Sequence, residues 1–89
     1  MSLAQIRYFI AVAEEGHVGR AAHGLRVAQP AVSRQIKNLE DELGALLFVR
    51  TSRGMQLSSS GRVFLDHARG ILQGVEHAAL AVRASRSTS

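Results

Sequence analysis

Five residues near the middle of the chain have the types and the spacing that suit contacts with a nucleic acid. An arginine can form two hydrogen bonds with the O6 and N7 atoms of guanine, and a glutamine can form two with adenine. Serine and lysine side chains suit hydrogen bonds with phosphate groups or with bases. Helical periodicity predicts that these residues share one face of a helix: Gln29, Pro30, Ser33, Arg34 and Lys37.

The opposite face of this predicted helix is an apolar stripe made of Val32, Ile36, Leu39 and Leu43. Pro30 suits the first helical position, because its missing N–H would lack an intrahelical partner there, and Gly44 ends the helix. A buried stripe backed by a short cationic face is what a groove-inserting helix requires. The alternative for Arg34 and Lys37 is an ordinary solvated face. The absence of any acidic residue from 20 to 38 favours the nucleic-acid interpretation.

Two further arginines belong to a predicted β-hairpin with strands at residues 46–50 and 55–57. Arg53 lies in the turn between them, where a guanidinium can enter or flank a DNA minor groove. Arg50 ends the first strand and can hold a phosphate. The alternative for Arg53 is a solvated loop arginine.

Two predicted helices precede this region. The first spans residues 3–15 and stops at Gly16, and the second is short, with Gly19 as its N-cap and its end before Val27. A tight turn at residues 25–28 separates the second helix from the one that Gln29 and Pro30 open. Helix, tight turn, helix and hairpin together predict a mainly α fold, a winged helix-turn-helix, over residues 1–57.

A long last helix is predicted from the serines at 58–60 to about Ala84, with a frayed tail at 85–89. At 1.5 Å per residue it would be about 40 Å long, which is more than one small core covers. Its apolar residues alternate four and three apart, the mean period of 3.5 that is typical of paired supercoiled helices. We therefore predict a homodimer through this helix, with a seam of Phe64, Ala68, Ile71, Val75, Ala78 and Val82.

Composition excludes several classes of function. The chain has 89 residues, enough for one small domain, and its net charge of +4 indicates a polyanionic partner. It has no cysteine, so disulfides, zinc–thiolate sites and a thiol nucleophile are excluded. The histidines lack metal-site spacing and no catalytic constellation is present, so we expect no cofactor, no metal and no enzymatic activity. Without a signal-peptide pattern or a run of about 18 apolar residues, the expected location is the cytoplasm, not a membrane.

From about Leu3 to Ala79 the sequence resembles the N-terminal DNA-binding domain of LysR-type transcriptional regulators. The resemblance is carried by Arg7-Tyr8-Phe9, Ala21-Ala22, Leu25, the run from Ala28 to Ile36, Leu39-Glu40, Leu43-Gly44, Leu47-Phe48, Arg50, Arg53-Gly54, Leu57-Ser58 and Gly61. It implies a winged helix-turn-helix followed by a linker helix, at 58–84, that pairs two subunits on a dyad promoter site in double-stranded DNA. By position, Gln29, Pro30, Ser33 and Arg34 would face the major groove and Arg53 the minor groove.

The opening segment, residues 7–16, also resembles members of the family that control aromatic-compound breakdown. The chain departs from the family pattern at Gly19, Ala28 and Gly61, which softens helix ends but leaves the base-facing residues intact. Members of the family carry a C-terminal effector-binding domain, so the resemblance implies that this chain is a fragment that cannot sense an inducer. Two rival interpretations remain: a helical protein-interaction module with an incidental basic face, and a small hydrolase-like enzyme.

Overall fold

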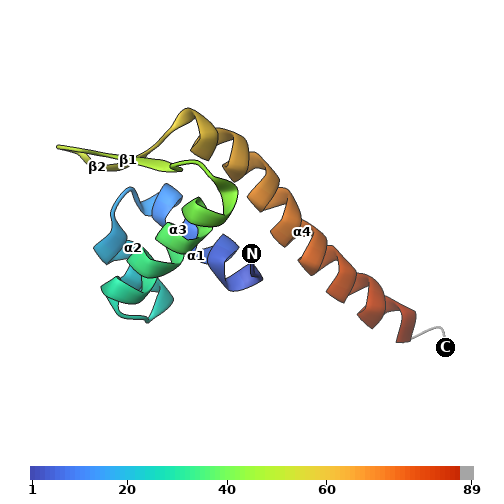
Figure 1. Ribbon diagram of the computed structural model, residues 1–89. Helices are drawn as coiled ribbons and strands as arrows, with labels where there is room; N and C mark the ends of the chain where they lie inside the picture. The colour runs from blue at the N-terminus through green and yellow to red at the C-terminus, as the bar shows by residue number, and fades with distance from the viewer. Residues whose placement is uncertain (87–89) are drawn as a thin grey trace.

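The computed structural model describes residues 1–86, which form a compact head and one projecting helix (Figure 1). The projection makes the molecule elongated, with extents of 54 × 26 × 21 Å. The order of elements confirms the predicted mainly α, winged helix-turn-helix fold. In chain order they are α1 (Leu3–Glu15), α2 (Val18–Leu25), α3 (Gln29–Leu43), β1 (Phe48–Thr51), β2 (Gly54–Leu57) and α4 (Ser59–Arg86).

The hydrophobic core lies where the first three helices, the hairpin and the start of α4 meet. Phe9 of α1 is fully buried, and its ring centroid lies 5.3 Å from that of Phe48 and 4.9 Å from that of Phe64. Aromatic contacts of this kind add to the free energy of burial. Each of α1, α2 and α3 contributes three buried apolar residues at helical spacing: Ile6, Phe9, Val12, Val18, Ala21, Ala22, Val32, Ile36 and Leu39.

The start of α2 differs from the prediction. Its N-cap is His17, not Gly19, and Nδ1 of His17 accepts a hydrogen bond of 3.3 Å from the backbone N–H of Arg20. Gly19 is the second residue of the helix. Histidine is not among the strongly preferred N-cap residues, so its residue type does not predict this cap. At the other end, Arg26 closes α2 in the left-handed conformation, with φ 59°.

Helix α3 begins one residue earlier than the proline. Gln29 is its first residue and Pro30 its second, because Ala28 takes the N-cap position without a side-chain hydrogen bond. Proline is tolerated at this second position for the reason that holds at the first, since the first four N–H groups of a helix have no intrahelical partner. The predicted end is confirmed: Gly44 has φ 70°, and its N–H donates to the carbonyl of Glu40.

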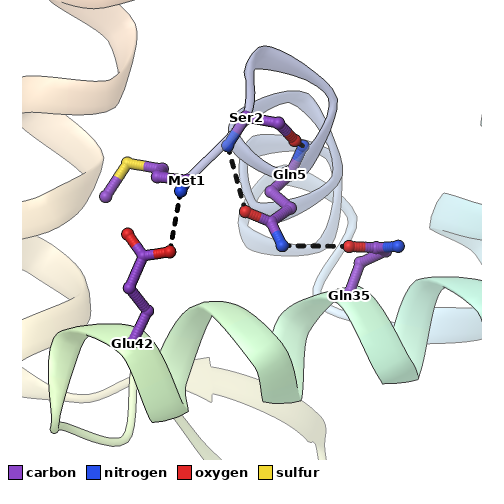
Figure 2. Close-up of polar contacts among 5 residues, drawn as sticks. All are labelled: Met1, Ser2, Gln5, Gln35 and Glu42. Carbon is purple, nitrogen blue, oxygen red and sulfur yellow. Dashed lines mark hydrogen bonds and ion pairs between the residues drawn. The ribbon is translucent and has the colours of Figure 1, made fainter.

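Polar contacts from the N-terminal segment hold α3 against α1 (Figure 2). The amide of Gln5 donates to Oε1 of Gln35 at 3.0 Å. Further along α3, the amino group of Met1 pairs with Glu42 at 2.7 Å. These contacts lie on the flank of α3 that faces α1, so they set the position of the helix without occupying its exposed side.

The hairpin is an antiparallel pair in which Phe48 faces Leu57 and Thr51 faces Gly54. Strand β1 begins two residues later than predicted, because the N–H of Leu47 donates to Oε2 of Glu40 at 2.8 Å, outside the ladder. The N–H of Met55 donates to the carbonyl of Gly16 at 3.0 Å and fixes the hairpin to the α1–α2 loop. Gly54 has φ 108°, and a Cβ there would overlap the carbonyl oxygen of Gly16.

Helix α4 is capped by Ser58, whose hydroxyl accepts from the N–H of Gly61 at 2.9 Å and donates to the carbonyl of Leu46. Gly61 packs directly on the backbone of Leu47, where a Cβ would overlap the carbonyl oxygen. The helix continues to Arg86, two residues beyond the predicted end; the rest of the predicted tail, 87–89, lies outside the described residues. None of the helices within residues 1–86 combines the length and the apolarity needed to cross a membrane.

Two residues of the predicted dimer seam contact the head of their own chain. Ala68 is fully buried, and Phe64 packs edge-on against Phe9. Ala68 therefore offers no surface to a partner. Phe64 is only half-buried and lines a surface hollow with Leu43 and Val63, so its place in the seam stays a prediction. The other seam residues, which are exposed, are Ile71, Val75, Ala78 and Val82, and dimerisation through them stays a prediction.

Candidate nucleic-acid interface

The outward face of α3 carries the five residues that the sequence singled out, and all are exposed: Gln29, Pro30, Ser33, Arg34 and Lys37. Side chains four residues apart are neighbours on a helix surface. Gln29, Ser33 and Lys37 therefore form one row, with Arg34 beside it. Val32, Ile36 and Leu39 of the opposite stripe are buried, so α3 presents this face outward; Leu43, predicted to complete the stripe, is 38% exposed.

The hairpin lies next to the row, and Arg50 of β1 joins the two elements. Arg50 lines a hollow of about 190 Å³ together with Ser33 and Lys37. It also lines a second hollow, of about 180 Å³, together with Gln29 and His17. Arg53 is exposed at the hairpin turn, where its N–H donates to Oγ1 of Thr51 at 3.1 Å. We call the combined face of α3 and the hairpin the basic surface; it comprises Gln29, Pro30, Ser33, Arg34, Lys37, Arg50 and Arg53.

The cations of the basic surface differ in how they are neutralised. Lys37 pairs with Asp41 one turn further along α3, at 3.5 Å, and both side chains are well exposed. Within the described part of the chain, Arg34, Arg50 and Arg53 form no ion pair. Exposed ion pairs are weak and easily exchanged. The three arginines are thus open to an anionic ligand, and Lys37 is held only loosely.

His17 is not among the candidate binding residues that the sequence predicts. In the sequence this histidine has no metal spacing, which favours a structural or surface role. The structure gives it a structural role as the cap of α2, and it also places it beside Gln29 and Arg50 in the second hollow.

The basic surface holds hydrogen-bond donors and positive charge rather than catalytic groups. The hydroxyl of Ser58, the first of three consecutive serines, is used in capping α4. Across residues 1–86, no group of three or more acidic or histidine side chains is placed to hold a metal ion. The arrangement is suited to binding an extended polyanion with a helix face and a hairpin together.

Comparisons with known proteins agree with this architecture. ClcR, an HTH-type transcriptional regulator of Pseudomonas putida, is 48% identical over 85 residues. That alignment covers 96% of this chain but only 29% of ClcR, so the chain spans less than a third of the length of this relative.

Two solved structures superpose closely on the whole chain. The crystal structure of the CbnR_DBD–DNA complex has a TM-score of 0.90 and 42% identity, covering 96% of this chain and 98% of that one. The BenM_DBD/catB site 1 DNA complex has a TM-score of 0.93 and 40% identity, covering 98% of each chain. Residues 3–62 match the family model for the bacterial regulatory helix-turn-helix proteins of the lysR family. The sequence resemblance is thereby confirmed, and the chain belongs to the LysR family.

Proposed function

We propose that this chain is the sequence-specific DNA-binding domain of a transcription regulator and that it binds a dyad site in double-stranded DNA as a homodimer. The observation that carries the proposal is the outward cationic face of α3: Arg34 is open to a ligand, and Arg50 of β1 lies next to Ser33 and Lys37. The titles of the similar CbnR and BenM structures, which describe DNA complexes of their DNA-binding domains, support the same function.

In this proposal α3 enters the major groove and the hairpin lies at the minor groove. Arg34 and Gln29 read base edges, with Ser33 and Pro30 packed against the same groove wall. Lys37 and Arg50 neutralise phosphates. Arg53 reaches the minor groove from the hairpin turn.

Dimerisation completes the site. A head of residues 1–57 carries the DNA contacts, and the following helix pairs two copies through Ile71, Val75, Ala78 and Val82. A two-fold dimer that places one α3 in each of two major-groove segments requires half-sites about 34–36 Å apart, or a multiple of that spacing.

The domain is proposed to act within a longer regulator, because the relative ClcR is more than three times as long as the aligned segment. An effector-binding domain would then follow α4 and supply the response to an inducer. We place the regulator in the cytoplasm, with its DNA. The resemblance of residues 7–16 supports a role in controlling aromatic-compound breakdown.

Selection of bound duplexes from a random library tests sequence specificity. We expect a two-fold symmetric consensus, and sedimentation of the chain alone should show a homodimer. If the chain alone is monomeric and the selection enriches no DNA sequence, the results would instead favour a protein-interaction module that pairs with a different protein.

A salt titration on the selected duplex tests the phosphate contacts. A dimer that neutralises about 6–10 phosphates should lose roughly 10³–10⁵-fold in affinity between about 50 and 200 mM salt. An affinity that does not change over this range would contradict the proposal.

A further inference from the structure

The cap of α2 fixes which edge of His17 is available to a ligand. Nδ1 of this histidine accepts the hydrogen bond from the N–H of Arg20 at 3.3 Å. A ring nitrogen that accepts a hydrogen bond carries no proton, so the neutral imidazole must carry its proton on Nε2. While it caps the helix, His17 is therefore a hydrogen-bond donor at Nε2.

The histidine that carries this donor lines the hollow between the start of α2, the start of α3 and the hairpin. The polar side chains around this hollow are those of His17, Gln29, Arg50 and Thr51, and no carboxylate lines it. The hydroxyl of Thr51 already donates to the carbonyl of Gly54. The donors left for a ligand are Nε2 of His17, the guanidinium of Arg50 and the amide of Gln29.

Gly19 provides the space that this cluster needs. A Cβ at position 19 would lie 3.0 Å from Cε1 of His17 and 3.3 Å from Oε1 of Gln29. The imidazole and the Gln29 side chain therefore meet over a residue that has no side chain. Gly19 and His17 work as a pair, because the ring occupies space that a larger residue at 19 would take.

We propose that this hollow binds a backbone phosphate of DNA and that Nε2 of His17 donates to one of its oxygens, beside Arg50. The inference rests on the proposed function and adds a contact to it. A cluster of donors without a carboxylate matches a phosphate, which offers only acceptors. The hollow, of about 180 Å³, accommodates a phosphate group and water rather than a larger ligand.

A neutral donor and a cation have different signatures. Replacing a phosphate-binding cation lowers the salt slope of binding by about 1, because one fewer counterion is released. A neutral His17 contributes affinity but releases no counterion. Its removal should weaken binding to every duplex by the same factor and leave the salt slope unchanged.

The variant His17→Asn tests the contact between Nε2 and the phosphate while a residue that can cap α2 stays in place. Asparagine is a strong N-cap residue, so the melting temperature should stay the same or rise, but its side chain is too short to replace Nε2. We expect the dissociation constant to rise roughly 10- to 150-fold per contact, as for a hydrogen bond to a charged group. The rise should be equal on the selected duplex and on a scrambled one. In the wild-type complex, ¹⁵N spectra of the imidazole should show the proton on Nε2.

Two matched variants complete the design. His23→Asn makes the same change on an exposed histidine of α2 that does not line the hollow, and it should leave affinity unchanged. Arg50→Gln should lower the salt slope by about 1 per protomer. Wild-type affinity in His17→Asn would overturn the inference, as would a salt slope that falls as it does in Arg50→Gln. Failure of the wild-type chain to bind DNA at all would instead remove the proposed function beneath it.

Discussion

Helices α3 and α4 are both amphipathic, but their apolar sides are buried to different extents by the rest of the chain. In α3, Val32, Ile36 and Leu39 are no more than 4% exposed, because α1 and α2 cover them, and only Leu43 at the end of the stripe is open, at 38%. In α4 only the first part is covered, and Ile71, at 41%, and Val82, at 63%, remain open to solvent.

The contrast indicates what each helix can bind. A helix whose apolar side is completed by its own chain has only its polar side left for a ligand, and in α3 that side is cationic. A helix that leaves large apolar side chains exposed gains free energy by pairing with another apolar surface. The difference therefore separates a face for a polyanion from a face for protein.

The largest expected effect comes from breaking the anchorage of α3. Leu39 has no exposed surface, so Leu39→Ala should lower the free energy of unfolding by about 2–5 kcal/mol through lost burial and a cavity. Denaturant unfolding of the dimer at fixed concentration measures the change. A loss below about 1 kcal/mol would mean that α3 is not held by its own stripe and that the contrast with α4 is false.

Breaking the exposed face of α4 should act on assembly instead of folding. Ile71→Asp should give monomers by sedimentation with unchanged helical circular dichroism, because burial of an isoleucine contributes about 1.5–3 kcal/mol per side chain and a buried carboxylate opposes pairing. Phe64→Asp should unfold the head, because Phe64 packs on Phe9. If Ile71→Asp remains a dimer, the exposed residues of α4 are not the seam.

The smallest expected effects come from single residues of the basic surface, where Arg34 and Lys37 can be compared. Arg34→Ala should weaken binding to the selected duplex by about 1–3 kcal/mol and relax the choice of base at one position. Lys37→Ala should cost less, because Lys37 already shares its charge with Asp41. Competition binding against single-base variants measures both effects. Equal weakening on all sequences by Arg34→Ala would show that this arginine holds only phosphate.

Much of the fold could be predicted because local signals and tertiary packing agree. Gly16 and Gly44 each take the left-handed conformation at the end of a helix, as their place after an apolar stripe predicts. The exposed face of α3 followed from the same periodicity. The cap of α2 could not be predicted. Its acceptor is a ring nitrogen of a histidine, whereas N-cap acceptors are usually hydroxyl or carboxylate oxygens.

The burial of Ala68, which the sequence placed in the dimer seam, has a different cause. The spacing of Phe64, Ala68 and Ile71 describes an apolar stripe, but a stripe does not say which surface covers it. Phe64, Ala68 and Leu72 pack against the head, whereas Ile71 lies on another side of the same helix and is 41% exposed. Only the three-dimensional course of the helix shows which of these residues the head covers and which remain for a second chain. The role of Arg50 as the link between α3 and the hairpin likewise depends on packing that periodicity does not contain.

The projecting part of α4 also gives the molecule a mechanical property. Leu72 is the last residue of this helix that packs on the core, and residues 73–86 continue for about 20 Å beyond it. Close to the point of departure, Arg69 pairs with Glu14 of α1 at 3.7 Å. If this part of α4 moves as a rigid body, a tilt of about 10° at its contact with α1 displaces its C-terminal end by about 3 Å. Helix α1, which contacts α4 through Glu14 and α3 through Gln5, would carry such a tilt to the face that the head presents.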